Sequence, residues 1–492
     1  MSMHKHVVIA GAGPAGLACA RAILTAAPGT DILLLEAGRP YRRRPCPVDR
    51  GRTCTGCAGI CNVISGFGGS MHYGDGAKLS LLPSGRRLVP HLGADRAGEL
   101  CETAFAWLTE PLGRTPELLG EHLTGRAVDA FAAHSLRIRE YPVAVLGESD
   151  LSTVIAGWHD LLASNVDLWH TSELTDAKKH GQHLELTVRT GPGEERRVSC
   201  DHLVLATGRR GVTSTTDLLK RLGVPTELPD ISVGVRLEMA VGLLEAIGAE
   251  HPDLKVSQLD HAQKIKSFCF CGGPNGGRIK VTNYQGAFGE EVLTLDGHET
   301  TERVPTGERP LAANFGLLCQ VQGRGNALEA RDSFIATYRR LAGGRPFAQS
   351  LRGFLTRRAD AASWPELHAR MPFQPSVLDL TAGPVDQLFT DAEHTSLTAG
   401  FRRFMGSILA HSHLGLTVDD VLDDVLVVGP ELEFLWDKPA IDADCKVAGL
   451  PIHVVGDSAG IAQGIVQAAM MGIAAGRRIA TSTSRTRATA RR

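Results

Sequence analysis

The feature that most constrains the fold of this chain lies at its start, where an apolar run leads into a glycine-rich turn. Val7–Ala10 is typical of a buried parallel strand, and Gly11, Gly13 and Gly16 follow it at GxGxxG spacing. In such a turn the first glycine permits a tight strand-to-helix connection and the second lets a pyrophosphate approach the backbone. The third lets the helix lie close to the strand. The free N–H groups at the helix start then face the phosphate charge.

A second strand supports the same interpretation. The run Asp31–Leu35 is apolar apart from its first residue, and it ends in Glu36. A dinucleotide-binding fold places the acid that hydrogen-bonds a ribose 2′-OH about 20 residues after the third glycine, which is where Glu36 lies. An ordinary βαβ unit without a ligand is the alternative. The turn, the second strand and the acid together favour a dinucleotide site.

Charge and composition exclude several other classes of protein. The 492 residues carry a net charge of −2, which gives no electrostatic reason to expect nucleic acid or an anionic membrane as a partner. No apolar stretch is long enough to cross a bilayer, and the early first strand leaves no room for an export signal. We therefore expect a cytoplasmic protein. Its eleven cysteines are then reduced thiols, metal ligands or redox groups rather than a disulfide scaffold.

Four of these cysteines lie within one short segment, at Cys46, Cys54, Cys57 and Cys61. Thiolates in a small loop can converge on a tetrahedral zinc ion or hold an iron–sulfur cluster. The nearest pair, Cys54 and Cys57, can instead form a redox disulfide, and four inert thiols lining a loop are the third interpretation. The spacing favours a metal or a cluster and leaves the other two interpretations open.

Five residues are candidates for catalysis by their location. A glycine-rich segment after the cysteines carries His72, Asp75 and Lys78, each of which can transfer protons at a cofactor or serve as a structural hydrogen-bond partner. Cys269 and Cys271 lie one residue apart in a strand-like run. If that run is extended, the two thiols face opposite sides, so only one of them can face a ligand. Buried, inert thiols are the alternative for this pair.

Two later segments repeat the character of the first strand. Leu203–Gly208 reads as a buried strand that ends in Thr207-Gly208, and Pro451–Gly460 contains a strand that ends in Gly456-Asp457. A glycine-rich helical run follows the second of them.

With these segments together, the chain resembles FAD flavoproteins of the glutathione-reductase structural class. The matching pieces are GAGPAG with Glu36, LATG at 205–208 and VVGDSAG at 454–460. The resemblance implies an α/β fold, in which a Rossmann-like FAD-binding domain with a parallel sheet and a small β-meander carries an inserted α+β substrate domain. It also implies that Asp457 binds a ribityl hydroxyl and that the helix near Gly460 points its positive end at the flavin. The residues expected to bind the cofactor are Gly11, Gly13, Pro14, Ala15, Gly16, Glu36, Ala37, Gly68, Gly69, Thr207, Gly208, Gly456, Asp457, Gly464, Ile465 and Val466.

More narrowly, the chain is similar to a family of FAD-dependent dehydrogenases, mostly of unassigned substrate. The similarity is carried by CPVDRG at 46–51, GFGG at 66–69, FCFC at 268–271 and GIVQA at 464–468. Two pieces depart from the family pattern. The family's SDGKL is GDGAKL at 74–79, one residue longer, and its CxCxGG is stretched by Pro274-Asn275. Both departures lie where the active site is expected.

These observations predict a domain organisation and a function. We expect residues 1–232 and 405–480 to form the FAD-binding domain, 233–404 the inserted substrate domain and 481–492 a flexible basic tail. The predicted function is that of an FAD-dependent oxidoreductase, which oxidises, desaturates or reduces a small organic substrate in a cleft between the two domains.

The sequence shows no clear second dinucleotide site. Besides its small-molecule substrate, the protein is therefore expected to exchange electrons with NAD(P)H bound transiently at the flavin or with an electron-transfer protein. Two alternatives stay open. One is a flavoprotein whose cysteine-bound zinc, iron–sulfur centre or redox disulfide passes electrons to a partner, and the other is a non-redox FAD-binding protein.

Overall fold

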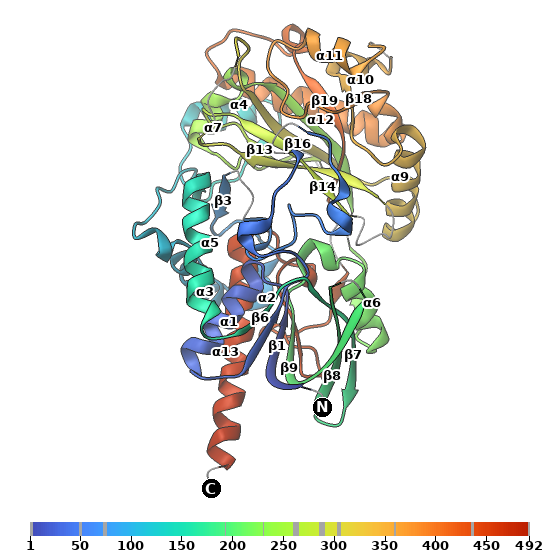
Figure 1. Cartoon of the computed structure of the whole chain (residues 1–492). Helices are drawn as coiled ribbons and strands as arrows, with labels where there is room; N and C mark the ends of the chain where they lie inside the picture. The colour runs from blue at the N-terminus through green and yellow to red at the C-terminus, as the bar shows by residue number, and fades with distance from the viewer. Residues whose placement is uncertain are drawn as a thin grey trace.

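The computed structural model describes residues 3–48, 52–71, 76–191, 193–229, 231–258, 265–284, 291–302, 307–358, 361–433 and 437–490. Within these residues two large sheets lie one above the other, each with its own buried apolar core (Figure 1). We call them the lower and the upper sheet.

The lower sheet is mainly parallel. Its strand order is β6-β2-β1-β9-β8-β7, with β21 also paired to β9. Strands β6, β2, β1, β9 and β21 run parallel, whereas β8 and β7 continue from β9 as an antiparallel meander. The parallel sheet and the meander predicted from the sequence are thus confirmed. The bounds are β1 (Met3–Ala10), β2 (Ile32–Leu35), β6 (Asp167–Trp169), β7 (Ser172–His180), β8 (His183–Thr190), β9 (Glu194–Leu205) and β21 (Ile452–Val454).

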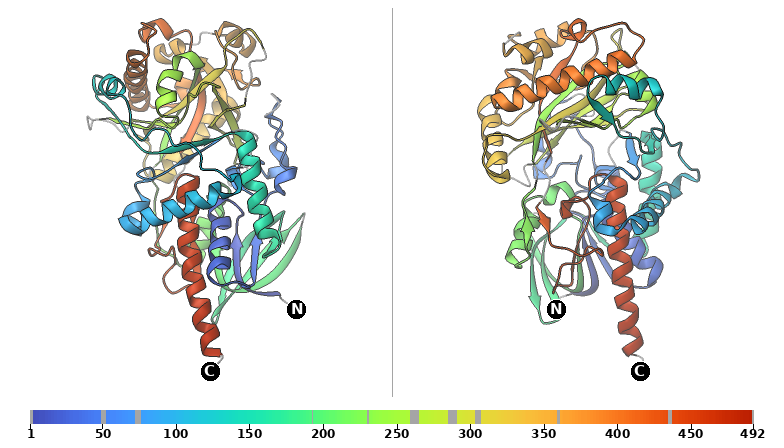
Figure 2. Two further views of the ribbon diagram at one scale, coloured as in Figure 1. Left: turned by 90° about the vertical axis from the view of Figure 1, so that its left-hand side faces the viewer. Right: turned by 180° about the vertical axis from the view of Figure 1, so that it is seen from behind.

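Two helices from opposite ends of the sequence pack together against this sheet. They are α1 (Pro14–Ala26) and α13 (Ile465–Ala490), which lie side by side in Figure 2. A Cβ atom at Gly472 would lie 2.1 Å from the carbonyl oxygen of Ala15, and one at Gly476 would lie 2.6 Å from that of Cys19. The two backbones can therefore approach this closely only because both positions are glycine.

The upper sheet has the order β18-β17-β19-β11-β16-β13-β12-β4, and α12 (Asp391–His411) crosses one of its faces (Figure 2). Its core is aromatic, with the rings of Phe315 and Phe404 in edge contact at 4.6 Å between centroids. The bounds are β4 (Leu136–Ile138), β11 (Ser232–Ala240), β12 (Val256–Gln258), β13 (Ile265–Cys271), β16 (Ala312–Gln320), β17 (Phe347–Ser350), β18 (Thr381–Ala382) and β19 (Leu426–Glu433).

The remaining elements connect or cover the sheets. Three short antiparallel pairs are β3 (Ala77–Ser80) with β5 (Val143–Leu146), β14 (Gly277–Asn283) with β15 (Leu293–Glu299), and β10 (Thr226–Glu227) with β20 (Lys438–Pro439). The helices are α2 (Leu88–Leu92), α3 (Ala94–Thr109), α4 (Gly125–Ala132), α5 (Glu148–Ala163), α6 (Ser214–Arg221), α7 (Glu245–Glu250), α9 (Ala327–Ala342), α10 (Leu351–Thr356) and α11 (Trp364–Arg370).

The sheets do not divide where the sequence placed the domain boundaries. The last third of α12 and the whole of β19 follow residue 404, yet β19 belongs to the upper sheet and α12 packs on it, and Ile408 and Val427 are buried in its core. β4 precedes residue 232 and also joins the upper sheet. The physical reason is that α12 runs unbroken through the predicted boundary, so the chain leaves the upper sheet only after β19.

The predicted flexible tail, residues 481–492, begins as an ordered part of α13. The helix continues to Ala490, and Thr483 is buried, with its hydroxyl 2.7 Å from Nε2 of His6 on β1. The hydroxyl of Ser482 lies 3.3 Å from Nε2 of His202 on β9. These hydroxyl–imidazole contacts dock the start of the segment onto the lower sheet, so the expectation of a flexible chain from residue 481 is corrected for these residues.

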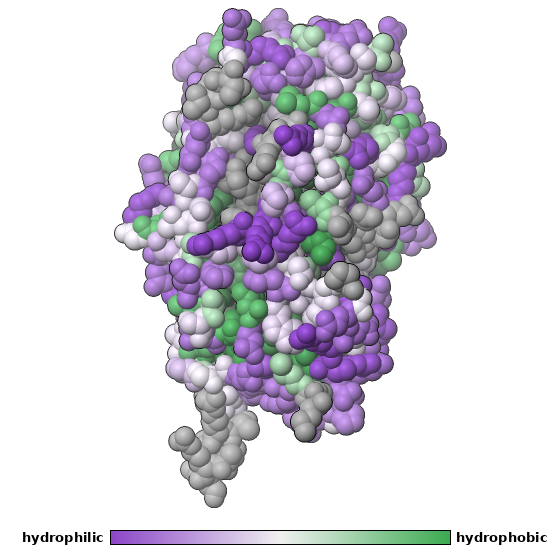
Figure 3. Space-filling model, in the orientation of Figure 1, coloured by the Kyte–Doolittle hydropathy of each residue, from purple (hydrophilic) through white to green (hydrophobic). Residues whose placement is uncertain are grey.

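The surface is mixed in polarity. In Figure 3 hydrophilic residues cover much of the visible face, and hydrophobic residues lie among them in smaller groups. Within the described part of the chain, we find no helix that combines the length and the apolar character needed to cross a membrane.

Candidate functional site

A pocket of about 550 Å³ lies between the two sheets. Its lower wall comes from the turns at the carboxyl ends of β1, β2, β9 and β21, where an open parallel sheet commonly binds ligands. Its upper wall comes from β13 and β15, and β3 contributes at the side. The pocket therefore connects the predicted cofactor residues with some of the predicted catalytic residues.

The three glycines of the first turn are required for different physical reasons. Gly11 has φ of +114°, and a Cβ atom there would lie 2.2 Å from the carbonyl oxygen of Ala206. At Gly16 a Cβ atom would lie 1.9 Å from the carbonyl oxygen of Gly11. Gly13 differs, because its φ is −84° and the nearest atom to an added Cβ is Cα of Gly69, at 3.8 Å. Packing within the protein thus explains Gly11 and Gly16 but not Gly13, which faces the pocket.

Glu36 fastens the turn from the end of β2. It is 5% exposed, and its carboxylate oxygens accept hydrogen bonds from the backbone N–H groups of Ala12, Gly38 and Gly66 at 2.9, 2.6 and 2.8 Å. The side chain also lines the pocket. It therefore holds the glycine turn and the 66–69 segment together at the position where a ribose-binding acid is expected.

Asp457 follows β21 at the opposite side of the lower wall. Burial raises the pKa of its carboxyl group to about 6, although the guanidinium of Arg209 acts to lower it and Asp296 acts to raise it further. Among the residues that the structure describes, none donates a hydrogen bond to the Asp457 carboxyl oxygens. Its neighbour Ser458 instead binds Thr207, with 2.9 Å between the two hydroxyl oxygens. Asp457 thus presents unused acceptors to the pocket.

Most of the predicted cofactor residues line this pocket. Those that do are Gly11, Gly13, Pro14, Ala15, Glu36, Ala37, Gly69, Thr207, Gly208, Gly456, Asp457, Gly464 and Ile465. Three others lie behind its wall, namely Gly16, Gly68 and Val466. Gly68 supports the wall from behind, since its N–H donates to the carbonyl oxygen of Ala12 at 2.8 Å.

The upper wall brings together three charged or ionisable side chains from distant strands. Nζ of Lys78 on β3 lies 3.4 Å from Sγ of Cys271 on β13 and 3.3 Å from Oε2 of Glu299 on β15, and it also donates to the carbonyl oxygen of Phe270. Side chains of Lys78 and Glu299 are 9% and 3% exposed. A lysine buried this deeply keeps its charge only when it is paired.

A bulge in β13 decides how the cysteine pair lies. The pairing of β13 with β16 shifts register between Phe268 and Cys271, and Cys269 has φ of +45°. A plain strand would place the two thiols on opposite faces, but at the bulge the thiol of Cys271 donates a hydrogen bond to the backbone carbonyl oxygen of Cys269 at 3.4 Å. Cys269 lines the pocket and Cys271 is buried behind it. Only one of the pair therefore faces the pocket, yet both belong to one cluster.

These contacts shift the acidities within the cluster. The neighbouring thiol of Cys271 is the largest cause that lowers the pKa of Cys269; burial acts to raise this pKa, and the charge of Lys78 lowers it further. Burial raises the pKa of Cys271 instead. Burial also raises the pKa of Glu299 to about 7, against the opposing effect of Lys78. The pocket wall thus holds a thiol of lowered pKa at Cys269, which donates to the carbonyl oxygen of Gly297 at 2.9 Å, and a carboxyl group whose pKa is raised toward neutral pH.

Arg236 holds the strained bulge in place. Its guanidinium forms a fork with the carboxylate of Glu431, at 2.7 and 2.6 Å, and it donates to the carbonyl oxygen of Cys269 at 3.1 Å. A third bond joins it to the Asn314 side chain at 2.6 Å. Arg236 and Glu431 are 0% and 1% exposed. The bidentate pair therefore fixes the backbone that carries the Cys269 thiol.

The remaining predicted residues are placed as follows. His72 and Asp75, the other two catalytic candidates, lie outside the described residues. Sequence reasoning missed Glu299 and Asp253, whose carboxylate accepts hydrogen bonds from Ser80 and Tyr141 at 2.8 and 2.9 Å beside the pocket. Neither residue belongs to a motif, and each becomes notable only through the strands that fold against it.

The four-cysteine segment lies beside the upper sheet and the β14–β15 hairpin. Cys46 and Cys61 are buried in a small apolar core, and Cys54 and Cys57 are half-buried. Burial raises the pKa of Cys61 to about 11, while its sulfur accepts the N–H of Asn283 at 3.5 Å. In the described residues no three of these sulfur atoms lie within 4.8 Å of one another, and none forms a disulfide. The predicted metal site at this segment stays a prediction.

Comparison with known proteins gives weak similarities only. No family model and no curated protein matches the chain. Similar solved structures include AlpK, at 13% identity and a TM-score of 0.38, over 97% of this chain and 62% of that one. Pyridoxine 4-oxidase from Mesorbium loti has 17% identity and a TM-score of 0.44, over 96% and 98%. OxyS anhydrotetracycline hydroxylase from Streptomyces rimosus has 13% identity and a TM-score of 0.37, over 98% and 63%. The chain thus spans less than two thirds of the length of AlpK and OxyS.

Proposed function

We propose that this protein is an FAD-dependent oxidoreductase that acts on a small organic molecule in the pocket between the two sheets. In this proposal the lower wall binds the dinucleotide and the upper wall, with Lys78, Cys269 and Glu299, faces the substrate. Within this class of enzyme, we assign the protein to the FAD-dependent dehydrogenases of the glutathione-reductase structural class, which its sequence resembles.

The observation that carries the proposal is the environment of Gly13. Neither backbone strain nor a neighbouring atom requires glycine there, since φ is −84° and an added Cβ would have its nearest contact at 3.8 Å. The two flanking glycines of the motif are both required by the protein's own packing. A ligand that touches the backbone at the start of α1 accounts for Gly13, and a pyrophosphate fits the free N–H groups there.

Other residues of the pocket fit the rest of the cofactor. Glu36 stands where a dinucleotide-binding fold places its ribose-binding acid. Asp457 offers unused acceptors to a chain of hydroxyl groups such as the ribityl chain. The bound flavin supplies hydride or electron chemistry that no side chain can supply. The protein supplies the position of the substrate, the exclusion of water and the movement of protons.

The proton chemistry is assigned to the upper wall. Glu299, with a pKa raised to about 7 by burial, can give or accept a proton at neutral pH. Lys78 lies 3.3 Å from it and keeps one positive charge in the wall, which favours negative charge that develops on a substrate. Cys269 contributes a thiol of lowered pKa that lines the pocket. These roles account for the candidates Cys269, Cys271 and Lys78 as one unit.

The first test is the visible spectrum of the purified protein, before and after reconstitution with FAD and removal of free cofactor. About one equivalent of tightly bound flavin, reducible in the absence of oxygen, is the expected result. A survey of small alcohols, amines and conjugated carbonyl compounds then looks for one that reduces or reoxidises the flavin at a catalytic rate. A protein that binds no FAD after reconstitution would refute the proposal.

The non-redox alternative gives a different result in the same experiment. A purely structural flavin would bind stoichiometrically, and Glu299→Gln would leave its reactions with all tested substrates and with NAD(P)H unchanged. In an oxidoreductase the substitution lowers the rate of flavin reduction by about a hundred- to ten-thousandfold, because a general acid or base contributes about that range.

A further inference from the structure

A second cluster of ionisable side chains lies in the lower sheet, away from the pocket. Its members are His4 on β1, His183 on β8 and Asp201 on β9. Their ligand-type atoms all lie within 4.8 Å of one another, and in the described residues no other group of three or more histidine, cysteine, aspartate or glutamate side chains does so. We propose that this cluster, the strand-end triad, is a surface site for a divalent transition-metal ion, Zn²⁺ in the first instance.

The pairing of three neighbouring strands creates the triad. Lys5 on β1 pairs with Cys200 on β9, and Cys200 also pairs with Leu184 on β8. The residues one step along, Asp201 and His183, therefore lie side by side on the same face of the sheet. His4 reaches the same face from β1, two residues before His6, which stands beside Asp201. The backbone ladder thus brings the three ligand residues together without a loop.

The distances suit a metal ion. Nε2 of His4 lies 3.4 Å from Oδ1 of Asp201, and Nδ1 of His183 lies 2.6 Å from the same oxygen. Zinc bonds of about 2.0–2.1 Å at tetrahedral angles place neighbouring ligand atoms about 3.3 Å apart, so the contact between His183 and Asp201 must open by less than about 1 Å. The ligand atoms of His4 and His183 already lie within 4.8 Å of each other. The side chains of His4 and His183 are 49% and 53% exposed, which leaves them room for this movement and open to ions in solution.

Second contacts orient the ligands. The other ring nitrogen of His4 lies 3.0 Å from the hydroxyl of Ser199, which leaves Nε2 for the metal. Oδ2 of Asp201 is bound by Nδ1 of His6 at 2.6 Å, and His6 is in turn held by Thr483 of α13 at 2.7 Å. Such partners of a ligating imidazole or carboxylate fix its orientation and raise metal affinity.

The donor set favours a cation. Two imidazoles and one carboxylate form a borderline donor set that suits Zn²⁺, and the three ligands leave a fourth position for water.

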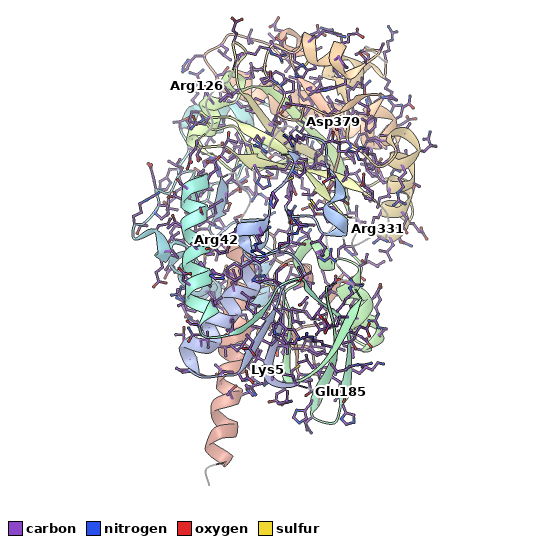
Figure 4. All side chains as sticks on the ribbon, in the orientation of Figure 1. Lys5, Arg42, Arg126, Glu185, Arg331 and Asp379 are labelled. Carbon is purple, nitrogen blue, oxygen red and sulfur yellow. The ribbon has the colours of Figure 1, made fainter. Side chains whose placement is uncertain are left out.

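The triad is remote from the flavin pocket. It lies at the start of β1, whereas the glycine turn follows the end of this eight-residue strand. At about 3.3 Å per residue the two sites are about 20 Å apart. Lys5 and Glu185, which flank the triad in the sequence, are labelled at the lower end of the molecule in Figure 4. A metal there would tie β1, β8 and β9 together without touching substrate or cofactor.

The test is isothermal titration of the chelator-treated full-length protein with ZnCl₂. Because the four-cysteine segment is also a predicted zinc site, the zinc stoichiometry of each variant is compared with that of the native protein. His183→Ala and Asp201→Asn remove ligands at the exposed rim of the sheet. His180→Ala removes an exposed histidine on the same hairpin, outside the triad, and serves as the matched control.

The expected result is that the native protein and His180→Ala bind about one equivalent of Zn²⁺ more than His183→Ala and Asp201→Asn do. After loading with Co²⁺, the difference spectrum should show weak d–d absorption without the strong near-ultraviolet band of thiolate ligation, which assigns the lost site to nitrogen and oxygen ligands. Equal zinc stoichiometry and affinity in all four proteins would overturn the proposal, and so would a thiolate band in the difference spectrum.

Discussion

Replacing Gly13 by valine tests cofactor binding separately from the stability of the fold. An added Cβ has open space, with Cα of Gly69 as its nearest neighbour at 3.8 Å. The γ-carbons of valine then extend into the pocket, which Gly13 lines. We therefore expect Gly13→Val to fold normally and to lose FAD.

The size of the loss follows from the contacts that the valine would block. A pyrophosphate at the start of α1 receives charge-assisted hydrogen bonds from backbone N–H groups, each worth about 1.5–3 kcal/mol. Losing one or two of them costs about 3 kcal/mol, which weakens binding roughly a hundredfold. The free energy of unfolding of the cofactor-free protein should change by less than about 1 kcal/mol, because no buried atom is displaced.

The assay has two readouts and two controls. FAD affinity is measured by quenching of flavin fluorescence on titration, and stability by urea denaturation of the cofactor-free protein. Gly98→Val on α3 is the matched control, since a Cβ there meets nothing within 4 Å and Gly98 does not line the pocket. Gly16→Ala is the opposite control, because its Cβ would lie 1.9 Å from the carbonyl oxygen of Gly11 and should destabilise the fold itself.

The reasoning fails if Gly13→Val binds FAD as tightly as the native protein while remaining equally stable. The turn would then have no pyrophosphate near Gly13. It also fails if Gly13→Val unfolds at a much lower urea concentration than the native protein. Such a result would mean that a side chain at residue 13 displaces neighbouring atoms of the fold.

Three further predictions concern the rest of the site. Lys78→Met should raise the pH midpoint for alkylation of Cys269 by iodoacetamide, read by peptide mass spectrometry, because the thiolate is the reactive form above its pKa and loses a stabilising charge; an unchanged midpoint would contradict this assignment. Arg236→Met should lower the free energy of unfolding by about 3–5 kcal/mol, because it leaves a buried carboxylate unpaired. The half-exposed ion pair of Arg352 with Asp423 provides the comparison, because breaking it should change the free energy of unfolding far less. If the four-cysteine segment binds zinc or an iron–sulfur cluster, Cys57→Ser should lower the metal content of protein purified without oxygen, measured by elemental analysis, whereas unchanged metal content and stability would favour inert thiols.

The lower wall of the pocket could be predicted from the sequence because its residues lie in local motifs, whereas the cofactor that it binds stays a prediction. The strand, turn and helix around Gly11, Gly13 and Gly16 are consecutive, and each glycine has its own steric signature in the motif. Glu36 follows at the fixed distance that one helix and one strand impose. Patterns of this kind need no knowledge of how distant segments meet.

The upper wall of the pocket could be predicted only in part. Its cluster comes from three separate strands. Only the folded chain brings Cys271 Sγ and Glu299 Oε2 within 3.4 Å of Lys78 Nζ. The sequence gives no sign of the bulge at Cys269, because no glycine lies at the residue with positive φ. The bulge is visible only in the shifted register of the strands and in the hydrogen bond from Arg236 to the Cys269 carbonyl oxygen. Domain boundaries failed for the same reason: α12 gives no local sign that it packs on the upper sheet.

The closing strand of the lower sheet has a consequence for biosynthesis. β21 pairs with β9, and Asp457 follows it, so the proposed cofactor site joins the first sixteen residues of the chain to residues beyond 450. The ribosome adds more than 400 residues after Gly16 before Gly456 exists, so the two sides of the lower pocket wall are made far apart in time. Until then α1 also lacks its contact with Gly472 and Gly476 of α13. If the pocket binds FAD as proposed, the cofactor binds only after this late segment has been made, and the nascent chain must keep its first strand and helix soluble until then.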